Sequence, residues 1–132
     1  METLYKLGIN DNDMKYILEQ LPEILETKEQ DIEEKIYLLE YIGCNERHIR
    51  NIIISNPLYL DRITSDIIKL INKLNNYGFT NLDLLFDSNP FLLNKDAFEI
   101  EEYINQRLSK NNSLEDIIDE FETNPYIIDE YY

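Results

Sequence analysis

The glycines and prolines of this chain fall on one repeating period, and that period limits the fold more than any other feature. The three glycines lie 35 residues apart, and the four prolines lie 35, 33 and 35 residues apart. These seven positions are Gly8, Gly43 and Gly78, together with Pro22, Pro57, Pro90 and Pro125. A period of about 35 residues is typical of helical solenoids, in which each unit packs on its neighbours. The spacing therefore predicts a helical-repeat protein.

Apolar residues keep the same register relative to each proline. The positions eight and four residues before a proline, and three residues after it, are apolar in every unit. They are Met14, Leu18, Leu25, Ile49, Ile53, Leu60, Leu82, Phe86, Leu93, Ile117, Phe121 and Ile128. The spacing of four residues places the first two positions on one face of the helix before each proline. Because an all-β sandwich or barrel needs many more turn residues than this, the expected fold class is all-α.

Each unit is expected to contain a helix A, a proline turn and a longer helix B. The glycine ends the preceding helix, since it adopts the left-handed conformation without steric cost. The expected N-caps of helix A are Asn10 or Asp11, Asn45, Thr80 and Ser113. Helix B is expected at 28–42, 62–75 and 96–110, with a capping box at 27–30 before the first of them. Pro90 follows Gly78 by 12 residues rather than 14, so the third helix A should be about half a turn shorter.

The pattern divides the chain into about 3.5 units of ~35 residues within a single helical-repeat domain, 1–132. The units span about 8–42, 43–77, 78–111 and 112–132. The last unit has a helix A and a proline turn but no helix B, so the solenoid is expected to be open there. Its apolar residues, Phe121, Tyr126, Ile127 and Ile128, are then candidates for self-association or for a partner contact, unless the tail folds back and covers them.

The residues around each glycine and proline also recur as a motif. The three copies are Leu7-Gly8-Ile9 with Leu21-Pro22-Glu23-Ile24-Leu25, Ile42-Gly43-Cys44 with Asn56-Pro57-Leu58-Tyr59-Leu60, and Tyr77-Gly78-Phe79 with Asn89-Pro90-Phe91-Leu92-Leu93. This motif resembles the repeat of the mitochondrial transcription termination factor (mTERF) family. The resemblance implies helical hairpins, each with a short third helix, stacked into a curved solenoid whose basic concave face grips double-stranded nucleic acid.

The charge of the chain departs from that expectation. The formal net charge is −15 at pH 7, which excludes the domain-wide basic face that most nucleic-acid binders carry. Residues 1–44 carry −7, residues 45–75 carry +2 and residues 76–132 carry −10. Only the middle unit is basic, and its two acidic flanks oppose the approach of a polyanion.

This charge pattern favours an acidic interaction protein that binds a basic protein surface. The nucleic-acid channel of a DNA- or RNA-handling protein is one such basic surface. An acidic protein of the phage or mobile-element type that mimics nucleic acid would bind this channel and so inhibit or regulate the DNA- or RNA-handling protein. The last unit is the most acidic and the least covered part of the predicted array. Its expected protein-binding residues are Asp116, Asp119, Glu120, Tyr126, Asp129 and Glu130.

Two alternative functions remain open. The first is binding of double-stranded nucleic acid, as in the mTERF family, through the basic middle unit. Its expected residues are Arg47, Arg50, Arg62, Lys69 and Lys73. A solvated helix face, or docking on an acidic segment of a second copy, explains these cations equally well. The second alternative is a homo-oligomeric structural protein joined through its open ends.

The sequence contains no motif for catalysis, for a cofactor or for a metal. Cys44 is the only cysteine and His48 the only histidine, so they supply neither a zinc site nor a nucleophile and base pair. Acidic pairs such as 33–34 and 101–102 lie between core positions, where solvated faces are expected. The start of the chain has no signal-peptide pattern, and the longest aliphatic run, 52–54, is far too short for a membrane span. We therefore expect a cytoplasmic, non-enzymatic protein without a cofactor.

Overall fold

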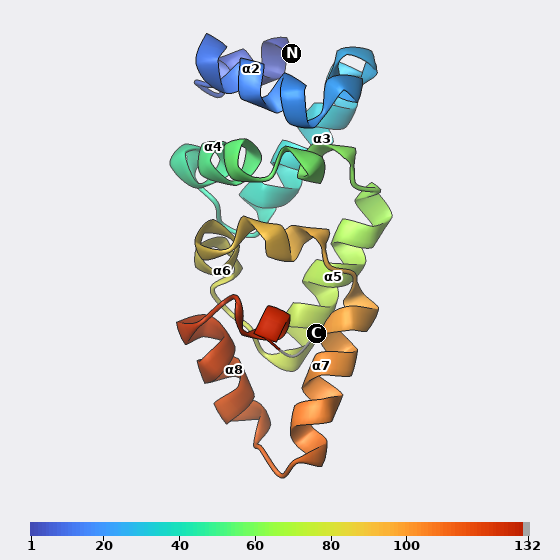
Figure 1. Ribbon diagram of the computed structural model, residues 1–132, viewed down its shortest axis with the longest axis vertical. Coiled ribbons are helices and arrows are strands. Elements are labelled where there is room, and N and C mark those ends of the chain that lie inside the picture. Colours follow the sequence, from blue (N-terminus) through green and yellow to red (C-terminus); the bar gives the residue numbers. More distant parts are fainter. Residues whose placement is uncertain (131–132) are drawn as a thin grey trace.

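The computed structural model describes residues 1–130, which form an all-α fold (Figure 1). The α-helices in this range are α1 (Glu2–Lys6), α2 (Asp11–Gln20), α3 (Glu29–Tyr41), α4 (Glu46–Ser55), α5 (Thr64–Tyr77), α6 (Leu82–Ser88), α7 (Ala97–Ser109) and α8 (Leu114–Thr123). Three proline turns are short 3₁₀ helices that begin at the proline, η1 (Pro22–Glu26), η2 (Pro57–Asp61) and η3 (Pro90–Asn94), and in the fourth turn η4 (Ile127–Glu130) begins two residues after Pro125. Helix A, the proline turn and helix B thus alternate in the predicted order.

The helices stack in two rows along the longest axis of the molecule (Figure 1). In the row of helices A, α2 packs on α4 and α4 packs on α6. In the row of helices B, α3 packs on α5 and α5 packs on α7. α1 packs on α3, as α3 packs on α5 one unit later. This arrangement confirms the helical-repeat solenoid of about 3.5 units.

All three glycines end helices in the left-handed conformation. Their φ angles are +100° at Gly8 and +104° at Gly43 and Gly78. At Gly78 the next amide, that of Phe79, reaches back 3.1 Å to the carbonyl oxygen of Leu74 and closes the helix end. The fourth unit has Asn111 at this place with a φ of 65°, a conformation that asparagine tolerates better than most residues.

Three of the expected N-caps are confirmed, and one is wrong. The side chains of Asn10, Asn45 and Ser113 each accept a hydrogen bond from the backbone of the third helical residue. The Thr80 cap is wrong, because α6 begins at Leu82 after Asn81, whose side chain makes no capping bond. α6 thus starts one residue later than expected, and the third unit also has two residues fewer between its glycine and its proline than the first two units have. α6 therefore has 7 residues where α2 and α4 have 10, a larger shortening than half a turn.

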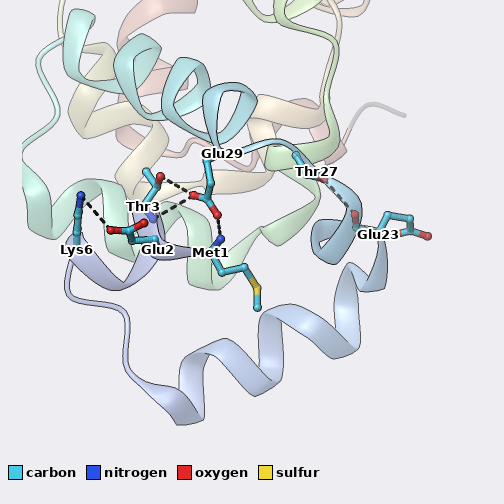
Figure 2. Close-up of polar contacts among 7 residues, drawn as sticks. All are labelled: Met1, Glu2, Thr3, Lys6, Glu23, Thr27 and Glu29. Carbon is cyan, nitrogen blue, oxygen red and sulfur yellow. Dashed lines mark hydrogen bonds and ion pairs between the residues drawn. The ribbon is translucent and has the colours of Figure 1, made fainter.

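The capping box expected at 27–30 is also wrong. Thr27 lies at the end of η1, where its hydroxyl donates to the carbonyl oxygen of Glu23 at 3.1 Å. Glu29 instead reaches α1, as Figure 2 shows, and accepts bonds from the Thr3 amide at 3.1 Å and the Thr3 hydroxyl at 2.6 Å. It also contacts the amino group of Met1. This carboxylate therefore joins the start of α3 to the start of α1.

The two rows enclose one continuous apolar core. Phe121 is fully buried between the rings of Phe79 and Tyr103, with edge-on centroid distances of 5.4 Å and 5.6 Å. Ile128 is also fully buried. The chain itself therefore covers Phe121 and Ile128, two of the four apolar residues of the last unit that were candidates for a contact with a partner. Tyr126 stays exposed and Ile127 half-buried.

The asparagines that precede the prolines join neighbouring units. The buried side-chain amide of Asn56 donates to the carbonyl oxygen of Pro90 at 3.0 Å and to Asn94 Oδ1 at 3.0 Å. The buried amide of Asn89 donates to the carbonyl oxygen of Pro125 at 3.0 Å. Because each acceptor belongs to the following proline turn, these bonds fix the spacing between the turns.

Candidate interaction surfaces

All charged residues of α8 and η4 are acidic. The segment 114–130 contains seven carboxylates and no lysine or arginine, and every one of these carboxylates is exposed. The reason lies in the helix period, since Ile117 and Phe121 turn inward and leave the remaining faces to polar residues. The carboxylates are Glu115, Asp116, Asp119, Glu120, Glu122, Asp129 and Glu130.

Three of the six expected protein-binding residues are engaged inside the molecule. Glu120 pairs with Arg107 at 2.6 Å, Asp129 pairs with Lys95 at 3.1 Å, and Glu130 accepts from the Asn124 amide at 3.3 Å. Within residues 1–130, the carboxylates of Asp116 and Asp119 have no such partner. Of the six expected residues, these two carboxylates and the exposed ring of Tyr126 are therefore the groups without such an internal bond.

The ion pair of Glu120 is anchored on a buried arginine. Arg107 is only 4% exposed, donates to the hydroxyl of Tyr103 at 2.8 Å and lies 5.9 Å from the centre of that ring. Burial alone would lower the pKa of the Arg107 guanidinium, but the hydrogen bonds with Glu120 and Tyr103 raise it above its ordinary value. Glu120 therefore has a structural partner, and replacing it would disturb α7.

A shallow hollow of about 300 Å³ lies beside these carboxylates on α8 and η4. Its lining residues are Asp119, Glu120, Thr123, Asn124 and Ile127. The hollow combines an apolar floor with an acidic rim. A basic side chain with a long aliphatic stem matches both parts, because its methylenes cover apolar surface while its head meets a carboxylate.

Most of the five cations expected to bind nucleic acid are used within the fold. Arg50 donates to the carbonyl oxygen of Leu7 at 3.1 Å and lies over Gly8. Arg62 donates to two carbonyl oxygens of the next proline turn, those of Leu93 at 3.1 Å and Lys95 at 3.0 Å. Lys73 of α5 pairs with Glu101 of α7 at 3.3 Å. These three cations connect repeat units.

Arg47 and Lys69 are the two remaining cations of that set, and both are exposed. Among residues 1–130 neither makes a side-chain hydrogen bond or an ion pair. Arg47 lies in the first turn of α4 and Lys69 in α5, so they belong to different rows of the stack in Figure 1. The structure therefore does not gather the basic residues into one patch.

The single cysteine and the single histidine of the chain are both buried. Burial raises the pKa of the Cys44 thiol to about 12, with a smaller contribution from the charges of Asp83 and Asp87. His48 is buried in the first turn of α4, where its Nδ1 accepts from the Asn45 amide at 3.3 Å. Within the described range, 1–130, no group of three or more His, Cys, Asp or Glu residues is placed to hold a metal ion. No helix in that range has the length and apolarity needed to cross a bilayer.

The repeat and its caps agree with a known family. The family model mTERF matches residues 1–86, about two thirds of the chain. The chain belongs to the mTERF family. The match spans the described elements from α1 to Phe86 in α6, and it includes all five cations of the expected nucleic-acid set. The acidic surface of α8 and η4 lies outside the matched mTERF region. No match was found among curated proteins.

Proposed function

We propose that this mTERF-family chain is a non-catalytic interaction protein that binds a basic protein surface through α8 and η4. The observation that carries the proposal is the surface of 114–130, whose own charged residues are all carboxylates and in which Asp116 and Asp119 have no internal partner. A net charge of −15 draws a basic partner toward the molecule and repels nucleic acid. A partner whose basic surface normally holds nucleic acid would be inhibited by this contact.

Capture of proteins from a cytoplasmic lysate of the source organism tests this proposal. The informative variant is Asp116→Lys with Asp119→Lys, and the matched control is Glu33→Lys with Glu34→Lys, two exposed carboxylates on α3. The wild type and the α3 control should retain the same proteins of high isoelectric point, and the α8 variant should lose them. Retention that survives the α8 change, or retention of acidic proteins only, would reject the proposal.

Binding of double-stranded nucleic acid is the second candidate, and membership of the mTERF family favours it. We choose Arg47 and Lys69 for its test, because the other three cations make bonds within the fold, so their substitution would also change stability. Gel shifts with a duplex at about 50 mM salt decide the question. Binding that is lost in Arg47→Glu with Lys69→Glu, and kept in the control Lys15→Glu with Lys28→Glu, would support it. Absence of any shift would remove it.

A further inference from the structure

A hollow of about 180 Å³ lies between α6 and α8, two helices of the same row in Figure 1. Its lining residues are Asn81, Leu84, Leu85, Ser88 and Glu122. It shares no lining residue with the hollow of α8 and η4 described above. Within residues 1–130, α4 packs closely along α6, whereas α6 and α8 make only weak backbone contact. The fourth helix A therefore leaves a gap beside the third.

The junction between α4 and α6 shows how such a place is closed within the fold. Asn51, six residues before Pro57, donates its side-chain amide to Asp87 Oδ1 at 2.8 Å and to the Asp87 carbonyl oxygen at 3.2 Å. Asp87 is three residues before Pro90. At this junction one helix A therefore provides a donor, and the next helix A provides the carboxylate that accepts from it.

At the junction between α6 and α8 the donor is missing. The same two positions relative to the prolines hold Leu84 and Glu122, so the carboxylate is retained while a leucine replaces the donor. Leu84 is 53% exposed. Within residues 1–130 the Glu122 carboxylate makes no hydrogen bond and no ion pair. A donor from another molecule can therefore take the place that Asn51 has at the preceding junction.

The lining of the hollow matches the side chain of arginine. Asn81 lies three residues before Leu84 and Ser88 lies four residues after it, so the three share one side of α6. In the described range neither the Asn81 nor the Ser88 side chain makes a hydrogen bond. Their oxygens and the Glu122 carboxylate are acceptors around an apolar floor. A guanidinium presents five donors in a planar fork, and its methylene stem covers apolar surface.

We propose that the hollow between α6 and α8 receives an arginine side chain of the basic partner, whose guanidinium donates to Glu122. This inference rests on the proposed function and adds to it the residue by which the partner is anchored. The seven carboxylates of α8 and η4 give this part of the molecule a negative potential, which favours a charged donor over a neutral one.

Nα-acetylarginine amide is the probe, because its guanidinium is its only charge. It is titrated into ¹⁵N-labelled protein at about 150 mM salt, which screens attraction beyond about 8 Å. The amide signals of residues 81–88 and of Glu122 should shift and saturate, and the other carboxylate residues of α8 should shift less. The uncharged analogue Nα-acetylcitrulline amide and the lysine analogue should each bind at least about threefold more weakly.

The variants address the two sides of the hollow. Glu122→Gln should weaken binding of the probe by at least about fivefold. Glu19→Gln is the matched control, since Glu19 is exposed at the same position before Pro22, and it should stay within about twofold. Leu84→Asn should also weaken binding, because it restores the internal donor found at the preceding junction. Leu84→Met keeps the apolar floor and should retain binding.

The outcomes separate this inference from the proposed function. Shifts spread evenly over the carboxylates, equal binding of the citrulline or lysine analogue, or equal effects of Glu122→Gln and Glu19→Gln would each overturn the arginine site, whatever the α8 variant does in the capture experiment. If the probe responds as expected while Asp116→Lys with Asp119→Lys still retains the basic proteins, the hollow stands and the proposed role of α8 is rejected. Circular dichroism of each variant establishes that it is folded.

Discussion

The side-chain amide of Asn56 donates a 3.0 Å hydrogen bond to the carbonyl oxygen of Pro90, in the proline turn of the following unit. Asn89 repeats this bond to Pro125 one unit later. Both asparagines are only 1% exposed. In the second and third units, the asparagine that ends helix A therefore also bonds the next proline turn, which ties local backbone geometry to the stacking of units.

Asn89→Ala should lower the free energy of unfolding by about 1–3 kcal/mol, because it removes a buried donor and leaves the Pro125 carbonyl without that bond. Asn124→Ala is the matched control, since Asn124 occupies the same position in the last unit but donates to the exposed Glu130. Urea denaturation followed by circular dichroism measures both. An equal loss in the two variants would show that the bond between units contributes nothing.

Gly43→Ala should destabilise the protein by about 1–2 kcal/mol, since its φ of +104° is unfavourable for any residue with a Cβ atom. A Cβ on Gly43 would meet Asp83 at an ordinary 3.7 Å, so the cost is conformational rather than steric. The opposite change, Asn111→Gly, should be neutral or stabilising, because Asn111 already adopts a φ of 65°. Thermal unfolding compares the two, and a destabilised Asn111→Gly variant would contradict this account.

Arg62→Met should cost about 1–3 kcal/mol, because two main-chain carbonyl oxygens of the next proline turn lose a charged donor. Arg47→Met should change stability by less than about 0.5 kcal/mol, since Arg47 is exposed on α4. Chemical denaturation of the two methionine variants measures this difference. Similar values for both would mean that the bonds of Arg62 do not stabilise the stack.

Alkylation of Cys44 should be at least about a hundredfold slower in the folded protein than in urea at pH 8. Burial raises the pKa of this thiol from 9.0 to about 12, so the folded protein holds it neutral and out of reach. Because folding raises the pKa, the folded protein holds the thiol proton more tightly than the unfolded chain does. The resulting contribution to stability is fully present below pH 9.0 and is lost as the pH rises toward 12. Mass spectrometry follows the labelling, with Cys44→Ser as the blank. Labelling at the rate of an unfolded thiol would refute the prediction.

The regular spacing of glycines and prolines predicts where the helices begin and end, because a few adjacent residues determine the backbone conformation at a helix end. Gly78 requires no knowledge of the rest of the chain to adopt a left-handed φ, and Pro57 starts η2 in the same way. The errors arise where two local motifs compete. Thr27 matches the start of a capping box, but it ends η1, where its hydroxyl donates to the Glu23 carbonyl, and α3 begins after Lys28 instead.

The sequence does not show which residues of the candidate sites are already engaged within the fold, because the groups that they bond come from other repeat units. Arg50 lies 43 residues from Leu7, and Arg62 lies 31 residues from Leu93, so no local pattern shows that these cations are engaged. A signal exists in the repeat itself: Asp83, seven residues before Pro90, faces Gly43 as Arg50, seven before Pro57, faces Gly8.

Stacking of α2 on α4 and of α5 on α7 has a consequence for how this chain can change over generations. Each helix depends on its immediate neighbours, so substitutions near α2 and near α7 should act additively on stability. Substitutions in α7 and α8 then need no compensating substitutions in α2. The two ends of the stack can therefore diverge independently of each other.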